Sequence, residues 1–177
     1  MRRASSVIKG AVKAFGYFSG WLVVLMMLLV LVEVFMRYVL KRAPMVADEF
    51  GGYMLVAIAF LGAAYTWQEK GHVRITALVS RLPSRMASWT RLIVLILVFV
   101  CVAVLIQGGY HFVAFSFRMH LRSSSWLVTP LQVPQMAILL GFILMALALF
   151  TTIVESVKDI RLGKNVEKET KIEEIVA

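Results

Sequence analysis

Four long apolar segments, separated by short polar stretches, dominate the hydropathy pattern of the chain. They cover about residues 15–39, 49–67, 89–117 and 127–157. A helix rises roughly 1.5 Å per residue, so about 20 apolar residues cross a hydrocarbon core of about 30 Å. None of the segments alternates in the way of a β-barrel strand, and in lipid the helix is then the remaining structure. The pattern predicts an all-α integral membrane protein in which residues 1–160 form a domain of four transmembrane helices.

The polar stretch between the second and third segments carries a weaker periodic pattern. Apolar residues recur at one face of a helix from Ile75 to Leu82, and Pro83 ends the pattern. We expect a short amphipathic helix at about residues 73–83 that lies in the membrane interface and turns its basic side chains toward lipid headgroups. A basic loop with accidental periodicity remains the alternative. The basic residues expected to anchor this region on the cytoplasmic side are His72, Arg74, Arg81 and Arg85.

Composition and charge agree with a membrane protein and indicate its orientation. Of 177 residues, 60% are hydrophobic and only 16% are charged, whereas about 25% charged residues is typical of a soluble domain. The N-terminal segment, the second loop and the tail carry 14 Lys and Arg, against 5 in the other two loops. The positive-inside rule therefore places both termini, including the charged tail at 161–177, in the cytoplasm. The net charge of +9 marks these flanks and contacts with membrane lipid, and does not indicate a nucleic-acid partner.

Four charged residues near the outer ends of the first two segments are candidate functional groups. Glu33 and Arg37 lie four residues apart on one helix face, and a lone charge near a bilayer centre costs about 2.5–3.5 kcal/mol. They form either a proton or cation site or, as we favour, an ion pair that docks this helix on a partner subunit, with Arg37 reaching the membrane interface. Asp48 and Glu49 open the second segment, where acids complement the helix dipole or contact a periplasmic partner; a cation site is the alternative.

Motifs of catalysis and cofactor binding do not occur in the sequence. Cys101 is the single cysteine, and of the three histidines only His111 falls within a span, so a bis-histidine haem site is not expected. There is no P-loop, HExxH or nucleophile motif. We therefore expect no enzymatic activity, no metal and no cofactor in this chain. None of the four spans has the polar, interrupted middle of a transport pathway, which favours a scaffold.

Short motifs in a fixed order give the chain a family resemblance. Val34 to Tyr38 closes the first span, and the acidic pair and Gly62 follow. The run His72-Val73-Arg74-Ile75 then precedes a loop from Ser124 to Pro134 that leads to Gly141. In this order the chain resembles the small membrane subunit (small permease, Q-type subunit) of the tripartite ATP-independent periplasmic (TRAP) transporters. Thr76 departs from the pattern, which has an acidic residue after the basic run.

The resemblance implies a function in transport. Such a subunit pairs with a large permease subunit and a soluble periplasmic substrate-binding protein, in the cytoplasmic (inner) membrane of a bacterium or archaeon. Import is sodium-driven secondary active symport of a small organic acid. The large subunit holds the substrate and sodium sites, and the small subunit resembles part of its stationary scaffold.

A different class of protein also has four helices and a glutamate in the first. Small proton-coupled multidrug exporters act as homo-oligomers, but they are shorter and have a weak charge bias. The distribution of 14 against 5 basic residues and the position of Glu33 near one end of its span disfavour this alternative. A membrane anchor of a respiratory complex is disfavoured by the placement of the histidines.

Overall fold

The computed structural model describes residues 2–41, 46–69, 84–124 and 127–161. They form four helices, α1 (Arg2–Val39), α2 (Val46–Gln68), α4 (Ser84–Met119) and α5 (Gln132–Arg161). All four are long and apolar enough to cross a membrane, and these residues contain no strand. This confirms the all-α, four-helix prediction. The predicted interfacial helix at 73–83, with His72, Arg74 and Arg81, lies outside the described residues, as does the side chain of Arg85.

Local sequence explains where the helices begin and end. Asp48 and Glu49 occupy the first turn of α2, and Arg37 and Arg118 occupy the last turns of α1 and α4, so each charge complements a helix dipole. Helix α5 begins at Gln132, so the residues from Leu127 that pattern assigned to the fourth span belong to the preceding loop. Pro134 lies in the first turn of α5, where its missing N–H costs no helical hydrogen bond.

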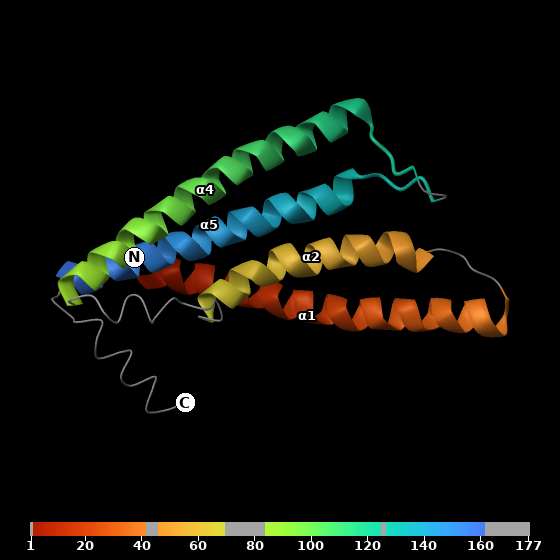
Figure 1. Ribbon diagram of the computed structural model, residues 1–177, viewed down its shortest axis with the longest axis horizontal. Coiled ribbons are helices and arrows are strands. Elements are labelled where there is room, and N and C mark those ends of the chain that lie inside the picture. The colour runs from red at the N-terminus through yellow and green to blue at the C-terminus, as the bar shows by residue number, and fades with distance from the viewer. Residues whose placement is uncertain (1, 42–45, 70–83, 125–126, 162–177) are drawn as a thin grey trace.

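The helices lie side by side in one layer, in the order α1, α2, α5, α4 (Figure 1). Helix α1 packs on α2, α2 on α5 and α5 on α4, and α1 also contacts α5. The helices converge at the end where the chain begins and spread apart at the other end, most visibly between α5 and α4 (Figure 1). A layer of this kind has two edges, one formed by α1 and the other by α4. We call the converging end the inner end and the spread end the outer end.

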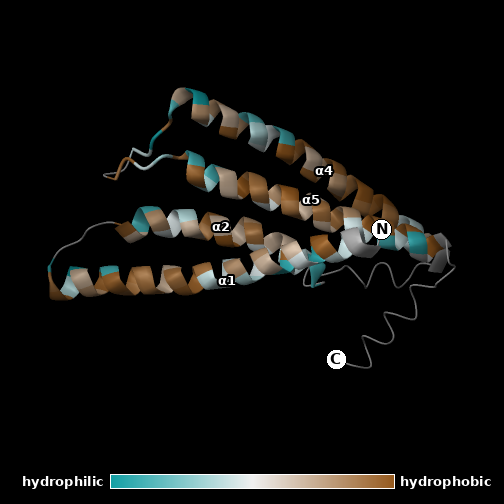
Figure 2. Cartoon of the chain, turned by 180° about the vertical axis from the view of Figure 1, so that it is seen from behind, coloured by the Kyte–Doolittle hydropathy of each residue, from teal (hydrophilic) through white to brown (hydrophobic). Residues whose placement is uncertain are grey.

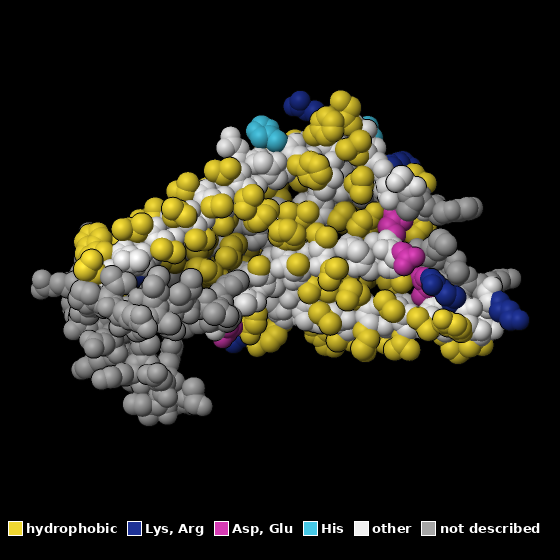
Figure 3. Space-filling model, in the orientation of Figure 1, with side chains coloured by type: hydrophobic (Ala, Val, Ile, Leu, Met, Phe, Trp, Pro, Cys, Tyr) yellow, Lys and Arg dark blue, Asp and Glu magenta, His cyan; other side chains and the backbone are white. Residues whose placement is uncertain are grey.

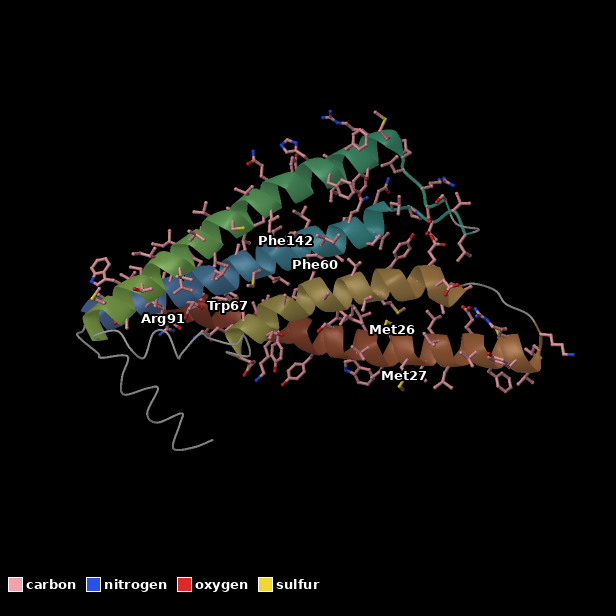
Figure 4. All side chains as sticks on the ribbon, in the orientation of Figure 1. Met26, Met27, Phe60, Trp67, Arg91 and Phe142 are labelled. Carbon is pink, nitrogen blue, oxygen red and sulfur yellow. The ribbon has the colours of Figure 1, made fainter. Side chains whose placement is uncertain are left out.

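Small residues and apolar clusters hold the layer together. One cluster joins α1, α2 and α5, and a second joins α4 and α5. Gly141 allows α5 to approach α2, because a Cβ there would lie 2.6 Å from the backbone oxygen of Phe60. Next to this contact the rings of Phe60 and Phe142 meet edge to face, with centroids 5.1 Å apart (Figure 4). The buried members of the clusters are Val12, Leu61, Ala64, Leu144 and Ala148 in the first and Leu95, Val102 and Leu149 in the second.

Most of the apolar side chains nevertheless lie at the surface of the chain. Between 11 and 28% of the most apolar stretch of each helix is buried. Hydrophobic residues therefore cover the helices along the layer (Figure 2). Membrane lipid or other membrane helices must cover this surface, since an apolar face of this size is not stable in water.

Candidate functional site: polar joints of helix α2

A buried carboxylate joins α1 to the start of α2. Glu33 on α1 is only 6% exposed. Arg37 Nη2 donates a hydrogen bond to Glu33 Oε1 over 2.7 Å, and the backbone N–H of Ala47 donates to Glu33 Oε2 over 2.5 Å. Ala47 lies in the first turn of α2, where backbone N–H groups have no acceptor within the helix. One carboxylate from α1 thus balances a guanidinium and caps a second helix.

Glu49 joins the start of α2 to the loop between α4 and α5. The hydroxyl of Tyr53 donates to Glu49 Oε1 over 2.7 Å, and the hydroxyl of Thr129 donates to the same oxygen. The two hydroxyl oxygens are themselves 3.0 Å apart. Thr129 is fixed in turn, because its carbonyl accepts the N–H of Ser123 over 2.8 Å within the loop. Asp48, the other member of the acidic pair, is exposed and has no hydrogen bond or ion pair to any described residue.

At the inner end, α2 and its neighbours share a second set of polar contacts. Lys9 Nζ on α1 lies 2.6 Å from Glu155 Oε1 on α5, and both side chains are about half exposed. Gln68 Nε2 donates to the carbonyl of Lys9 over 3.3 Å. The indole N–H of Trp67 donates to Thr152 Oγ1 over 3.3 Å, and the ring packs among the apolar clusters (Figure 4). These contacts link α1, α2 and α5 at the level where the helices converge.

The structure thus places the four predicted charges in three different environments. Glu33 and Arg37 pair with each other, as their i, i+4 spacing indicated, whereas Glu49 and Asp48 have different environments. Sequence reasoning missed Thr129 and Ala47, whose contacts join distant parts of the chain. It also missed the contact of Tyr53 with Glu49, although their i, i+4 spacing on α2 was a usable signal.

The hydrogen bonds at these joints fix the helices to one another. Within the described residues no group of three His, Cys, Asp or Glu side chains is placed to hold a metal ion. A shallow groove of about 450 Å³ between α1 and α2 is lined mostly by small residues, including Gly16 and Gly20. Ser19 in this groove already donates to the carbonyl of Gly16 over 2.7 Å. The carboxylates of Glu33 and Glu49 are likewise engaged in hydrogen bonds that hold α2 to α1 and to the loop before α5.

Comparison with known proteins agrees with the fold. Residues 26–159, well over half of the chain, match the family model described as tripartite ATP-independent periplasmic transporters, DctQ component. A Haemophilus influenzae protein whose assigned name is TRAP transporter small permease protein is 30% identical over 86 residues. That match covers 49% of this chain and 53% of the relative, so it spans about half of the relative's length. The chain therefore belongs to the DctQ family, which is a family of TRAP transporter components.

Proposed function

We propose that this chain is the small scaffold subunit of a TRAP secondary transporter. It pairs with a large permease subunit and works with a periplasmic substrate-binding protein in the sodium-driven import of a small organic acid. Membership of the DctQ family carries this proposal. The partners, the coupling ion and the substrate class follow from the family.

The continuity of the membrane helices supports a role as scaffold and not as transport pathway. Substrate and ion sites of secondary transporters typically lie where transmembrane helices are interrupted near the bilayer midplane. Helices α1, α2, α4 and α5 are each continuous over their full lengths. Glu33 is the buried acid among the described residues, and each of its carboxylate oxygens already accepts a hydrogen bond, one from Arg37 and one from Ala47. Substrate and sodium are therefore assigned to the large subunit.

We assign the predicted site residues to two sides of an inner membrane. Glu33, Arg37 and Glu49 fix the outer end of α2, and the exposed Asp48 is available to a periplasmic partner. The basic residues His72, Arg74, Arg81 and Arg85 are proposed to anchor the opposite side on anionic lipid. The 14 to 5 distribution of Lys and Arg supports cytoplasmic termini in this orientation.

The direct test is purification of the tagged chain from its native membrane in mild detergent, with co-purifying proteins identified by mass. A large polytopic membrane protein recovered in a fixed ratio to the chain is the expected result. The matched control is an untagged chain from the same cells. A homo-oligomer with no such partner would overturn the proposal and favour the small multidrug exporter.

A further inference from the structure

The edge of the layer formed by α4 carries a polar stripe. Gln107, His111 and Arg118 are separated by four and seven residues, so they lie on one face of the helix. The opposite face of α4 packs on α5, through the contact of Gly109 with Leu139. Val113 and Ser116 are buried on this same packed side, whereas all three members of the polar stripe are exposed.

Contacts between the helices place two of these side chains near the middle of the membrane. Helix α2 has 23 residues and a length of roughly 34 Å, close to the thickness of the bilayer core, so its midpoint marks the middle of the membrane. Phe60 lies within one turn of the midpoint of α2 and contacts Gly141 on α5. Leu139, half a turn away on α5, contacts Gly109 on α4. Gln107 and His111 flank Gly109 and therefore lie near mid-membrane.

Lipid alone does not satisfy the two side chains near mid-membrane, Gln107 and His111. Within the described residues, Gln107, His111 and Arg118 have no hydrogen bond or ion pair; the ring of His111 contacts that of Tyr110, with centroids 5.9 Å apart. Arg118 lies roughly 13 Å further out than Gly109, where a long side chain reaches the headgroup region. The shorter Gln107 and His111 side chains do not reach it. A polar side chain at this depth typically faces protein or a water-filled cavity.

The edge formed by α1 is different. Its exposed side chains at membrane depth are apolar; Leu25, Leu28 and Val32 are examples. Met27 also points outward there, whereas Met26 points toward α2 (Figure 4). In the space-filling view, histidine and basic side chains project from the α4 edge, and the α1 edge is hydrophobic between its ends (Figure 3). The α1 edge suits lipid, whereas the outer half of the α4 edge combines exposed apolar side chains with three polar ones and suits a protein partner.

We propose that a transmembrane helix of the large permease packs on the outward face of α4 and presents hydrogen-bond acceptors to Gln107, His111 and Arg118. The identity of the partner rests on the proposed function. Arg118 has donors only, so the facing group must be a hydrogen-bond acceptor, and a carboxylate or a carbonyl oxygen suits it best. At the level of Gln107 and His111, hydroxyl or amide side chains serve, as they do between other membrane helices. The exposed ring of Phe115 lies between His111 and Arg118 and adds apolar contact.

Photo-crosslinking within the intact complex tests this surface. The photoreactive residue p-benzoyl-phenylalanine replaces Phe115 on the α4 edge or, as matched control, Leu28 on the α1 edge; the two are 52% and 49% exposed. The expected result is a crosslink to the large permease from position 115 and none from position 28. A crosslink from position 115 only to lipid or to a second copy of this chain would overturn the proposal, as would equal crosslinking to the permease from both edges.

Substitution of the stripe gives a second, independent measurement. The double variant Gln107→Leu His111→Leu makes the edge more compatible with lipid, so the chain itself should remain in the membrane at its normal level. We expect it to lower the large permease recovered per chain by about fivefold. Unchanged recovery would overturn the α4 surface while the proposed function stands. Failure of the unsubstituted chain to recover any permease would overturn the proposed function instead.

Discussion

The outer and inner ends of α2 are fastened by opposite means. At the outer end, two carboxylates make the connections to α1 and to the loop before α5. At the inner end, buried apolar residues such as Leu61 and Ala64 make them, and the Lys9–Glu155 ion pair is added at the surface. We therefore expect an ion pair to matter most at the outer end, where the helices spread apart, and least at the inner end, where they are already packed.

Burial is the reason why we expect the Glu33 joint to contribute more to stability than the Lys9–Glu155 pair. The Glu33 side chain is 7% exposed and its pair has a helix N-terminus as a third member, so loss of the carboxylate leaves polar groups without an acceptor. The side chains of Lys9 and Glu155 are 44% and 49% exposed, and water replaces either one when its partner is removed. The comparison predicts a descending series of effects.

The largest effect is expected for Glu33→Ala. The substitution deprives Arg37 and the N–H of Ala47 of their acceptor, and we expect a loss of about 2 kcal/mol in the free energy of unfolding. Arg37 is about half exposed, which keeps the loss below that of a fully buried pair. Thermal unfolding of the purified chain in detergent measures it.

Conservative variants at the same joint separate charge from hydrogen bonding. Glu33→Gln keeps an acceptor for one of the two donors and should give an intermediate loss. Arg37→Gln leaves the cap on Ala47 in place and should cost less than Glu33→Ala. If Glu33→Gln and Arg37→Gln, alone and together, leave stability, assembly and uptake unchanged, the joint has no structural role.

The sequence was sufficient to predict local contacts but not contacts between distant parts of the chain. Hydropathy was sufficient for four helices, and i, i+4 spacing was sufficient for the Glu33–Arg37 pair. The acceptor of the Ala47 N–H was not predictable, because a backbone donor has no signature of its own and its contact depends on how the chain returns after α1. Thr129 is equally hidden, since its partner Glu49 is 80 residues away.

The order of the helices was also beyond the sequence, for a physical reason. In a soluble helix an apolar stripe marks the packed face, but in a membrane the lipid-facing side is apolar too. Gly141 and Gly16 show where helices approach closely, because a Cβ on either would collide with Phe60 or Tyr65. Gly20 has the same residue type and no neighbour at its Cβ position, so composition does not distinguish them.

The loop joint should give the next largest effect. Thr129→Val removes one hydroxyl donor from Glu49 with little change in shape, and Tyr53→Phe removes the other. We expect each to cost about 1 kcal/mol and the pair to be non-additive, because the two hydroxyls share one acceptor and contact each other. A double-mutant cycle on thermal unfolding measures the coupling. Strict additivity would show that the two hydroxyls act separately, contrary to the described network.

The smallest effect is expected at the inner ion pair, and its dependence on salt makes the comparison sharpest. Lys9→Met and Glu155→Gln should each lower stability by about 0.5 kcal/mol or less, because both side chains are solvated and apolar packing already holds α1 against α5. The coupling between them should fall toward zero when salt is raised to about 1 M, where charges are screened over about 3 Å. The Glu33 variants should keep their effect under the same conditions, because Glu33 is shielded from ions and also binds a backbone N–H. A loss on Lys9→Met equal to that of Glu33→Ala would mean that the inner end, too, depends on its charges.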